Sequence, residues 1–202
     1  MSYVIGVCGQ SCSGKTKAVK AIIDSLSSEC SPNLKATIIS QDSYYFPGNH
    51  ETNFDVPTSI DFNLMVSHIK DLIDGKEVNS PIYDFTTHNR LINTKKLLPS
   101  KILLIEGILI FSCSELRSLM NLKVFISSYG EVAFARRLKR DVEERGRTIS
   151  EVTERYFRDV LPSSKFYVEP SESWADIVLK NNIQDQFIGL KILIDHIHIT
   201  LK

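Results

Sequence analysis

The octapeptide GQSCSGKT at Gly9–Thr16 sets the architecture of this chain. It matches G-x-x-x-x-G-K-[ST], a loop whose backbone N–H groups surround phosphate. The apolar run YVIGVC precedes it at Tyr3–Cys8, and apolar residues recur at helical spacing from Thr16 to about Leu26. A phosphate-binding loop works between a buried strand and a helix, because the helix N-terminus adds positive charge. We therefore predict a P-loop here.

The loop predicts direct contacts to a nucleoside triphosphate. Lys15 is expected to reach the β- and γ-phosphates, and Thr16 to offer its hydroxyl to Mg²⁺. Glu106 follows the apolar strand ILLI and is the second predicted metal ligand, since Mg²⁺ favours one or two carboxylates plus waters. A turn or helix-capping carboxylate is the alternative for Glu106. The nucleotide-binding set is Gly9, Gln10, Ser11, Cys12, Ser13, Gly14, Lys15 and Thr16.

Strands alternate with helices along the rest of the chain, which predicts an α/β fold with a mostly parallel sheet and helices on both faces. Further strands are expected at Ala36–Ser40, Ile102–Ile105, Lys123–Ile126 and Ala175–Leu179. Helices are expected from a cap at Ser59 or Asp61 to Gly75, over Glu131–Glu144, from about Ser150, and over Gln184–Leu201. Residues 82–98 read as a strand pair or extended loop. We predict one domain over 1–202, with an insertion at about 77–98.

Composition excludes several classes of protein. Twenty-four basic residues balance twenty-four acidic ones, so no global positive field favours nucleic acid or an anionic membrane. No apolar run approaches the length of a membrane helix, and the N-terminus lacks the basic start of a signal peptide. The cysteines follow neither a metal-ligand nor a disulfide pattern, so we expect reduced thiols in a cytoplasmic protein. They are Cys8, Cys12, Cys30 and Cys113.

A P-loop alone leaves open a switch GTPase, an ATP-driven machine or a small-molecule kinase. The chain contains neither D-x-x-G nor N-K-x-D, which a GTPase needs for its switch and for guanine. Asp42 follows the strand at Ala36–Ser40, and ligands of open α/β sheets bind outside the carboxyl ends of strands. Asp42 is therefore the candidate general base for transfer to an alcohol, with an Asx-turn residue as the alternative.

Two further segments suit a kinase. Arginines crowd the sequence ARRLKRDVEERGR, which predicts a lid over about 136–156 that closes on the phosphates, with a salt-bridged solvent helix as the alternative. The stretch PIYDFTTHNR at Pro81–Arg90 gathers rings and hydrogen-bonding groups, which suits a small, planar, polar ligand. The lid arginines are Arg136, Arg137, Arg140, Arg145 and Arg147.

Taken together, the chain resembles a uridine-cytidine kinase, of the uridine kinase and phosphoribulokinase group of P-loop kinases, from about Ile5 to about Asp185. The phosphate loop is shared by many families, whereas P-x-Y-D-F-x-x-H-x-R is far more specific. Besides these two, the resemblance rests on QDSYY at Gln41–Tyr45, NFDVP at Asn53–Pro57, IEGIL at Glu106, RRLKRDVEERGR and WADIV at Trp174–Val178.

The resemblance implies ATP and Mg²⁺ as cofactors, a pyrimidine nucleoside as substrate, and a homo-oligomer, either dimer or tetramer. It implies that PIYDFTTHNR forms a β-hairpin over the nucleoside, with Asp42 as base for the 5′-hydroxyl and Lys15, Arg140 and Arg145 on the phosphates. Implied substrate contacts are Tyr45, Asp55, Tyr83, Phe85, His88, Arg137, Arg147 and Arg155.

The chain departs from the family pattern at several places. Val56-Pro57-Thr58 replaces the usual His-Pro-Asp, and Arg155 stands where a glutamine usually contacts the ribose. PSESWAD lacks the usual lysines, and KNNIQD replaces the turn near the adenine, so no adenine contact is implied. Two alternatives therefore stay open: a kinase for another alcohol (nicotinamide riboside, pantothenate or a sugar phosphate), and a catalytically silent nucleotide-binding regulator.

Overall fold

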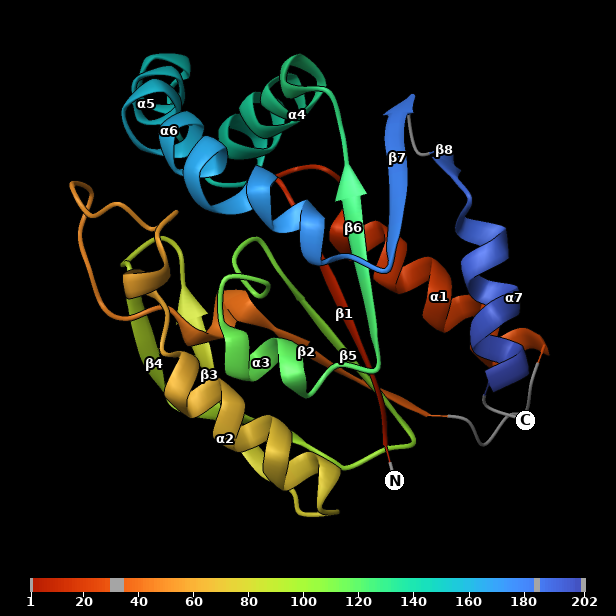
Figure 1. Cartoon of the computed structure of the whole chain (residues 1–202). Helices are drawn as coiled ribbons and strands as arrows, with labels where there is room; N and C mark the ends of the chain where they lie inside the picture. Colours follow the sequence, from red (N-terminus) through yellow and green to blue (C-terminus); the bar gives the residue numbers. More distant parts are fainter. Residues whose placement is uncertain (1, 30–34, 184–185, 201–202) are drawn as a thin grey trace.

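The computed structural model describes residues 2–29, 35–183 and 186–200. Its centre is a sheet of six strands in the order β2-β5-β1-β6-β7-β8 (Figure 1). All neighbouring strands are parallel except β7 and β8, which pair antiparallel. The strands are β1 (Tyr3–Gly9), β2 (Ala36–Ser40), β5 (Ile102–Gly107), β6 (Leu122–Ser127), β7 (Ile177–Ile183) and β8 (Gln186–Ile188). The predicted mostly parallel α/β fold is confirmed.

The sheet is covered on both faces, so its inner strands are apolar on both sides. Ile5 and Val7 of β1 contribute to the core under α1 (Lys15–Glu29) and α7 (Leu190–Thr200). The alternate residues Val4 and Cys8 point into the opposite core. That second core lies under α2 (Phe62–Ile73), α3 (Ser114–Ser118) and the smaller sheet (Figure 1). Every residue of β5 is buried, as the continuous run ILLI predicts.

The segment around PIYDFTTHNR forms a separate antiparallel pair, β3 (Val78–Asp84) and β4 (Asn89–Leu97). Tyr83 pairs with Arg90, and the register shifts between Pro81 and Tyr83. Proline cannot donate to a ladder, so it is confined to such irregular or edge positions. Of the two readings of this stretch, the strand pair is the one that forms.

The arginine-rich segment forms α4 (Gly130–Glu143) and α5 (Ile149–Arg155), joined through Gly146 at φ 64°. Thr148 and Glu151 cap α5 reciprocally, as in a capping box. Short helical stretches continue from Tyr156 to Trp174 as η3, α6, η4 and η5. The helices α4 and α5 lie beyond the carboxyl ends of the parallel strands (Figure 1), where ligands of open α/β sheets bind.

Some boundaries differ from the prediction. The helix expected over 184–201 is wrong at its start, because Gln186–Ile188 pairs with β7 as β8. Gly189 (φ 88°) then turns the chain into α7 at Leu190. The last parallel strand covers 177–183 instead of 175–179, and α3 was not predicted. Asp61, and not Ser59, caps α2 by accepting from the Leu64 N–H. Residues 184–185 and 201 of the expected closing helix, and Cys30, lie outside the described residues.

Across the described part of the chain, no helix combines the length and apolar character needed to cross a bilayer. Cys8, Cys12 and Cys113 are all free thiols.

Candidate active site

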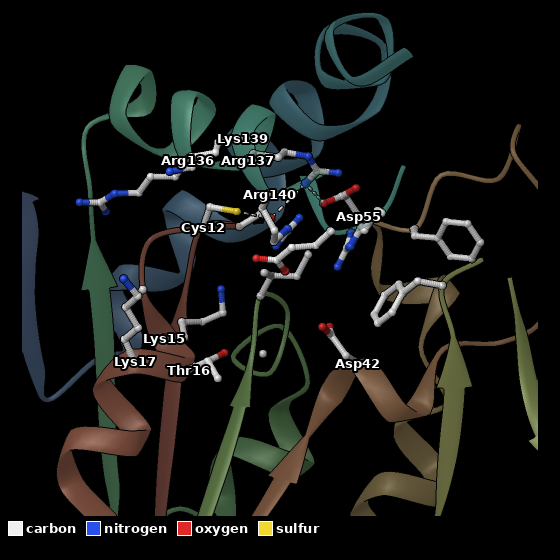
Figure 2. Close-up of a pocket in the computed structure, with 18 of the residues that line it drawn as sticks. Cys12, Lys15, Thr16, Lys17, Asp42, Asp55, Arg136, Arg137, Lys139 and Arg140 are labelled. Atoms are coloured by element: carbon white, nitrogen blue, oxygen red, sulfur yellow. Dashed lines mark hydrogen bonds and ion pairs between the residues drawn. The ribbon is translucent and has the colours of Figure 1, made fainter. Parts of the chain in front are cut away.

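A cavity of about 830 Å³ opens at the carboxyl edge of the parallel sheet. The P-loop, Asp42, the β3–β4 hairpin and the lid helix α4 all contribute side chains to its wall. Figure 2 shows Lys15 and Thr16 on one side, Asp42 across from them, and Asp55 with the lid arginines above. The predicted residues that line it are Ser11, Cys12, Gly14, Lys15, Thr16, Asp42, Tyr45, Asp55, Tyr83, Phe85, His88, Glu106, Arg137, Arg140, Arg145, Arg147 and Arg155.

The phosphate loop has the backbone that its glycines predict. Gly9 has φ 145°, and a Cβ there would lie 2.3 Å from the Ile126 carbonyl oxygen. Gly14 has φ 103°, and a Cβ there would lie 2.4 Å from Asn181 Nδ2. Lys15 is buried and its Nζ donates to the Gln10 carbonyl at 2.8 Å. Cys12 also has positive φ (62°), a strained conformation that is common at functional sites.

Three residues of the predicted nucleotide set do not line this cavity: Gly9, Gln10 and Ser13. The Ser13 side chain is fully buried, and Gln10 donates its side-chain amide to Glu169 at 3.0 Å. Gln10 instead faces a second cavity of about 350 Å³ between α4 and the helical stretches that follow it. Any contact these residues make to phosphate therefore comes from the backbone.

Thr16 and Glu106 form an oxygen-rich corner beside the loop. Glu106 accepts from the Thr16 hydroxyl at 3.2 Å and from the Ser40 hydroxyl at 2.6 Å. Glu106 is buried at the end of β5, where it is paired with Ser40 of the neighbouring strand β2. A carboxylate plus a hydroxyl is the donor set that Mg²⁺ uses beside a nucleotide, so these residues fit the ion.

Asp42 faces this corner from the first turn after β2. Burial, followed by the negative charge of Glu106, raises the pKa of Asp42 above its ordinary value. Lys15, Arg145 and Arg140 oppose that shift. A carboxylate in this balance takes up a proton more readily than one in water, as general-base catalysis requires.

An aromatic clamp, defined as Tyr45, Phe54, Tyr83, Phe85 and His88, forms the opposite end of the cavity. Phe54 stacks on His88 with centroids 5.2 Å apart and planes at 14°. Tyr83 lies between Tyr45 and Phe85, each 5.3 Å away. Such ring walls suit a planar ligand. Phe54 was not predicted as a site residue, and its position directly before Asp55 was the signal available.

Two groups in the clamp have hydrogen-bonding capacity left. The Tyr83 hydroxyl is buried and has no hydrogen-bond partner within the described residues. Burial raises the Tyr83 pKa to about 12, so it stays protonated at neutral pH. Burial, then the charges of Arg155 and Arg147, lower the pKa of His88. His88 therefore presents a neutral imidazole, which can donate at one nitrogen and accept at the other.

Arg90, from the end of the same motif, anchors the hairpin. Its guanidinium donates to the Tyr44 and Tyr45 carbonyls at 2.9 Å each and to Asp61 at 3.2 Å. These bonds tie β4 to the segment that carries Asp42 and Tyr45. The sequence predicts no site role for Arg90, and its side chain does not line the cavity.

The lid is organised by Asp141, an acidic residue that lies among the arginines of ARRLKRDVEERGR. Asp141 is fully buried and lies within 4 Å of four guanidinium groups. Burial favours its neutral form, but Arg140, Arg137 and Arg145 lower the pKa of Asp141 overall. The arginines it gathers are Arg137 (3.6 Å), Arg140 (2.8 Å), Arg145 (3.4 Å) and Arg147 (3.2 Å).

The lid also reaches both ends of the cavity. Arg137 donates to Ser11 of the P-loop at 3.0 Å and lies 4.0 Å from Asp55. Arg145 places its guanidinium 4.4 Å from the Phe85 ring centroid, a cation–π contact with the clamp. Arg136 instead donates to the Asn181 carbonyl at 3.1 Å, on the β7 side. The lid therefore joins the phosphate loop to the hairpin over one cavity.

A P-loop heading a parallel sheet, an arginine-rich lid, and a carboxylate across the cavity define a P-loop kinase. Residues 4–186 match the Phosphoribulokinase / Uridine kinase family, and the chain belongs to this family.

Two relatives and one solved structure illustrate the similarity. The chain is 40% identical over 205 residues to uridine-cytidine kinase A of Dictyostelium discoideum, covering 98% of this chain and 40% of that protein. It is 36% identical over 189 residues to a uridine kinase of Streptococcus agalactiae, covering 90% of this chain and 88% of that protein. Phosphoribulokinase from Rhodobacter spheroides shares the fold, with TM-score 0.65 and 16% identity over 89% of this chain and 70% of that one.

Proposed function

We propose that this chain transfers the γ-phosphoryl group of ATP to the 5′-hydroxyl of a pyrimidine nucleoside, making UMP or CMP. The observation that carries the proposal is one cavity with the phosphate loop and Asp42 on its walls and the aromatic clamp at its far end. Relatives named uridine kinase and uridine-cytidine kinase support the same substrate class.

In the proposed reaction, Asp42 accepts the proton of the 5′-hydroxyl as that oxygen bonds to the γ-phosphorus. The bond from the γ-phosphorus to the β–γ bridging oxygen breaks, and ADP leaves. Lys15, Arg140 and Arg145 offset the negative charge on the transferring group. Asp55 binds the ribose hydroxyls with help from Arg137, which lies 4.0 Å away. Asp55 is half-buried, and loss of hydration raises its pKa against the lowering effect of Arg137.

Thr16 and Glu106 are the residues proposed to hold Mg²⁺, directly or through water. When bound there, the ion would offset the negative charge of the phosphate oxygens. Ser40 has a positioning role here, because its hydroxyl fixes the second oxygen of Glu106 at 2.6 Å.

At the nucleoside end, Phe85 and Phe54 pack on the base, and Tyr83 and His88 meet its polar edge. Stacking of a base on an aromatic ring contributes roughly 1–3 kcal/mol in nucleic-acid sites. A site whose polar groups bind a polar ligand edge strongly rejects a ligand that lacks that edge, because its own groups are then left unpaired. A clamp of this composition therefore favours a nucleobase over an aliphatic alcohol. Tyr45 and Arg147 complete the proposed substrate contacts.

A coupled ATP-consumption assay tests the proposal with uridine, cytidine, nicotinamide riboside, pantothenate and a sugar phosphate, with and without Mg²⁺. We expect nucleotide-forming turnover with a pyrimidine nucleoside only, and loss of turnover without the ion. His88→Ala should raise the KM for pyrimidine nucleosides, whereas Thr87→Ala, in the same turn, should not. Preference for another alcohol, or ATP consumption that no acceptor increases, contradicts the proposal.

The proposal includes a cytoplasmic location, which the free thiols of Cys8, Cys12 and Cys113 support. It also includes assembly into a dimer or tetramer. The outer edge formed by the end of β7, by β8 and by α7 exposes large apolar side chains, which supports a contact between subunits there. These are Ile183, Ile188, Ile192 and Ile199.

A further inference from the structure

Asn181 joins the end of β7 to the phosphate loop. It follows Lys180, the last residue of β7 that pairs with β6, and it lines the main cavity. Only 1% of its surface is exposed, and its side-chain Nδ2 donates to the Ser13 carbonyl at 2.7 Å. Because β6 separates β7 from β1 in the sheet, this bond reaches past one strand to the loop that follows β1. The reaction proposed above gives Asn181 no role.

The bond to Ser13 fixes which way the Asn181 amide faces. A carbonyl oxygen only accepts hydrogen bonds, so the nitrogen of the amide must face Ser13. The amide oxygen, Oδ1, is then buried without a hydrogen-bond partner among the described residues. A buried polar atom without a partner lowers the stability of the fold, and an apolar side chain would fill the space without that loss. The bond to the loop therefore explains an asparagine here better than packing does.

The backbone of Asn181 is itself held in place. Ser128, directly after β6, donates its hydroxyl to the Asn181 carbonyl at 3.1 Å. Arg136 of the lid helix α4 donates to the same carbonyl, also at 3.1 Å. On the side of the loop, Gly14 leaves room for the amide, since a Cβ at Gly14 would lie 2.4 Å from Nδ2. The amide thus bonds the phosphate loop from a fixed point.

This bond sets the orientation of one peptide unit of the loop. The Ser13 carbonyl and the Gly14 N–H belong to the same planar unit and point in opposite directions. With the carbonyl held by Asn181, the Gly14 N–H points away from Asn181 and has no backbone partner within the described part of the chain. Backbone N–H groups of such a loop are the groups that bind phosphate.

We propose that Asn181 is a positioning residue that holds the phosphate loop in the conformation that binds a triphosphate. The inference rests on the proposed function only in taking a nucleoside triphosphate as the ligand of the loop. It concerns the phosphates and not the base, so inorganic tripolyphosphate, which has no base, is a suitable probe.

Isothermal titration calorimetry with tripolyphosphate and with ATP, both with Mg²⁺, tests the inference on wild type, Asn181→Ala and Asn181→Leu. Leucine keeps the branching of asparagine but has no donor. We expect both variants to bind both ligands about ten-fold more weakly, the scale of one hydrogen bond. In steady-state kinetics, the KM for ATP should rise by a similar factor while the KM for uridine stays unchanged. The titration measures affinity separately from the amount of folded protein.

Asn121→Ala is the matched control, because Asn121 also bonds a backbone group beside the loop-bearing strand. Its side chain accepts from the Val4 N–H at 2.8 Å, at the amino end of β1. Loss of this bond lowers stability and should leave both affinities at the wild-type value.

Wild-type affinities in Asn181→Leu would mean that the residue only fills space, and they overturn the inference. Weaker binding of ATP with normal binding of tripolyphosphate would place Asn181 at the base, and overturns it as well. Either result leaves the nucleoside kinase intact if the wild type phosphorylates uridine. A wild type that binds neither ligand overturns the proposed function itself.

Discussion

Asp42 combines a catalytic position with a cost to the folded state. Its pKa is raised by burial and by Glu106, so the ionised form is less favourable in the folded protein than in the unfolded chain. The cost is absent below the ordinary pKa of aspartate and is fully present above the raised folded-state pKa. At neutral pH, Asp42 therefore lowers stability, whereas in the proposed reaction it is the proton acceptor.

Asp42→Asn should reduce kcat by at least about 100-fold, the range of general-base catalysis, with uridine binding nearly unchanged. The same variant should melt at a higher temperature than wild type at pH 7, and this difference should vanish in acid. Asp24→Asn, at an exposed position on α1, is the control and should change neither property. Near-normal transfer of labelled phosphate by Asp42→Asn would show that Asp42 is not the base.

Ionisation of Asp141 has the opposite effect on the stability of the folded protein. Its pKa is lowered, so its ionisation stabilises the folded protein above the ordinary aspartate range, and the contribution is lost as pH falls through the lowered pKa. Asp141→Asn leaves four guanidinium groups without their common counter-ion. Breaking a buried ion pair by removing one partner costs about 3–5 kcal/mol.

We therefore expect Asp141→Asn to lower the free energy of unfolding in urea by that amount, with a smaller difference at acid pH. Glu115→Gln is the comparison, because Glu115 pairs with Lys70 at the exposed surface. Exposed pairs contribute about 0–1 kcal/mol. If the two variants lose the same small amount of stability, Asp141 does not organise the lid.

At the scale of elements, the β3–β4 hairpin owes its position to Arg90. The hairpin carries three rings of the clamp, and Arg90 bonds it to the turn that carries Asp42 and Tyr45. Arg90 makes these bonds to the protein and does not line the main cavity.

Arg90→Ala should raise the KM for nucleoside about ten-fold and change kcat by only a few-fold, since the phosphate loop and Asp42 stay in place. Lys95→Ala, exposed on the same strand, provides the matched control. Steady-state kinetics at saturating ATP measure both constants. An unchanged KM would mean that the hairpin holds its place without this latch.

The elements that sequence predicted best are those with one strong local signal. Gly9 and Gly14 sit at positive φ where few other residues fit, so the motif alone located the loop. The β8 strand was missed, because QFI is short and lies next to a sequence of helical apolar spacing, and only its pairing with β7 makes it a strand. Asp141 could not be singled out for a related reason: Asp141, Glu143 and Glu144 are neighbouring acids in the sequence, and only tertiary packing buries the first of them.

At the scale of the whole molecule, the lid contacts both ends of the cavity. Arg137 contacts the phosphate loop through Ser11, and Arg145 contacts the clamp through Phe85. Asp141 holds both arginines, at 3.6 and 3.4 Å. The phosphate loop and the aromatic clamp are thus linked through a single buried carboxylate.

The most direct measurement is a crystal structure of the chain with uridine and a non-hydrolysable ATP analogue. We expect the triphosphate along Gly9–Thr16, the uracil ring within the clamp, and the 5′-oxygen at hydrogen-bond distance, about 2.6–3.2 Å, from the Asp42 carboxylate. Uridine bound away from the clamp, or a 5′-oxygen that cannot reach Asp42 while the γ-phosphate occupies the loop, would contradict it.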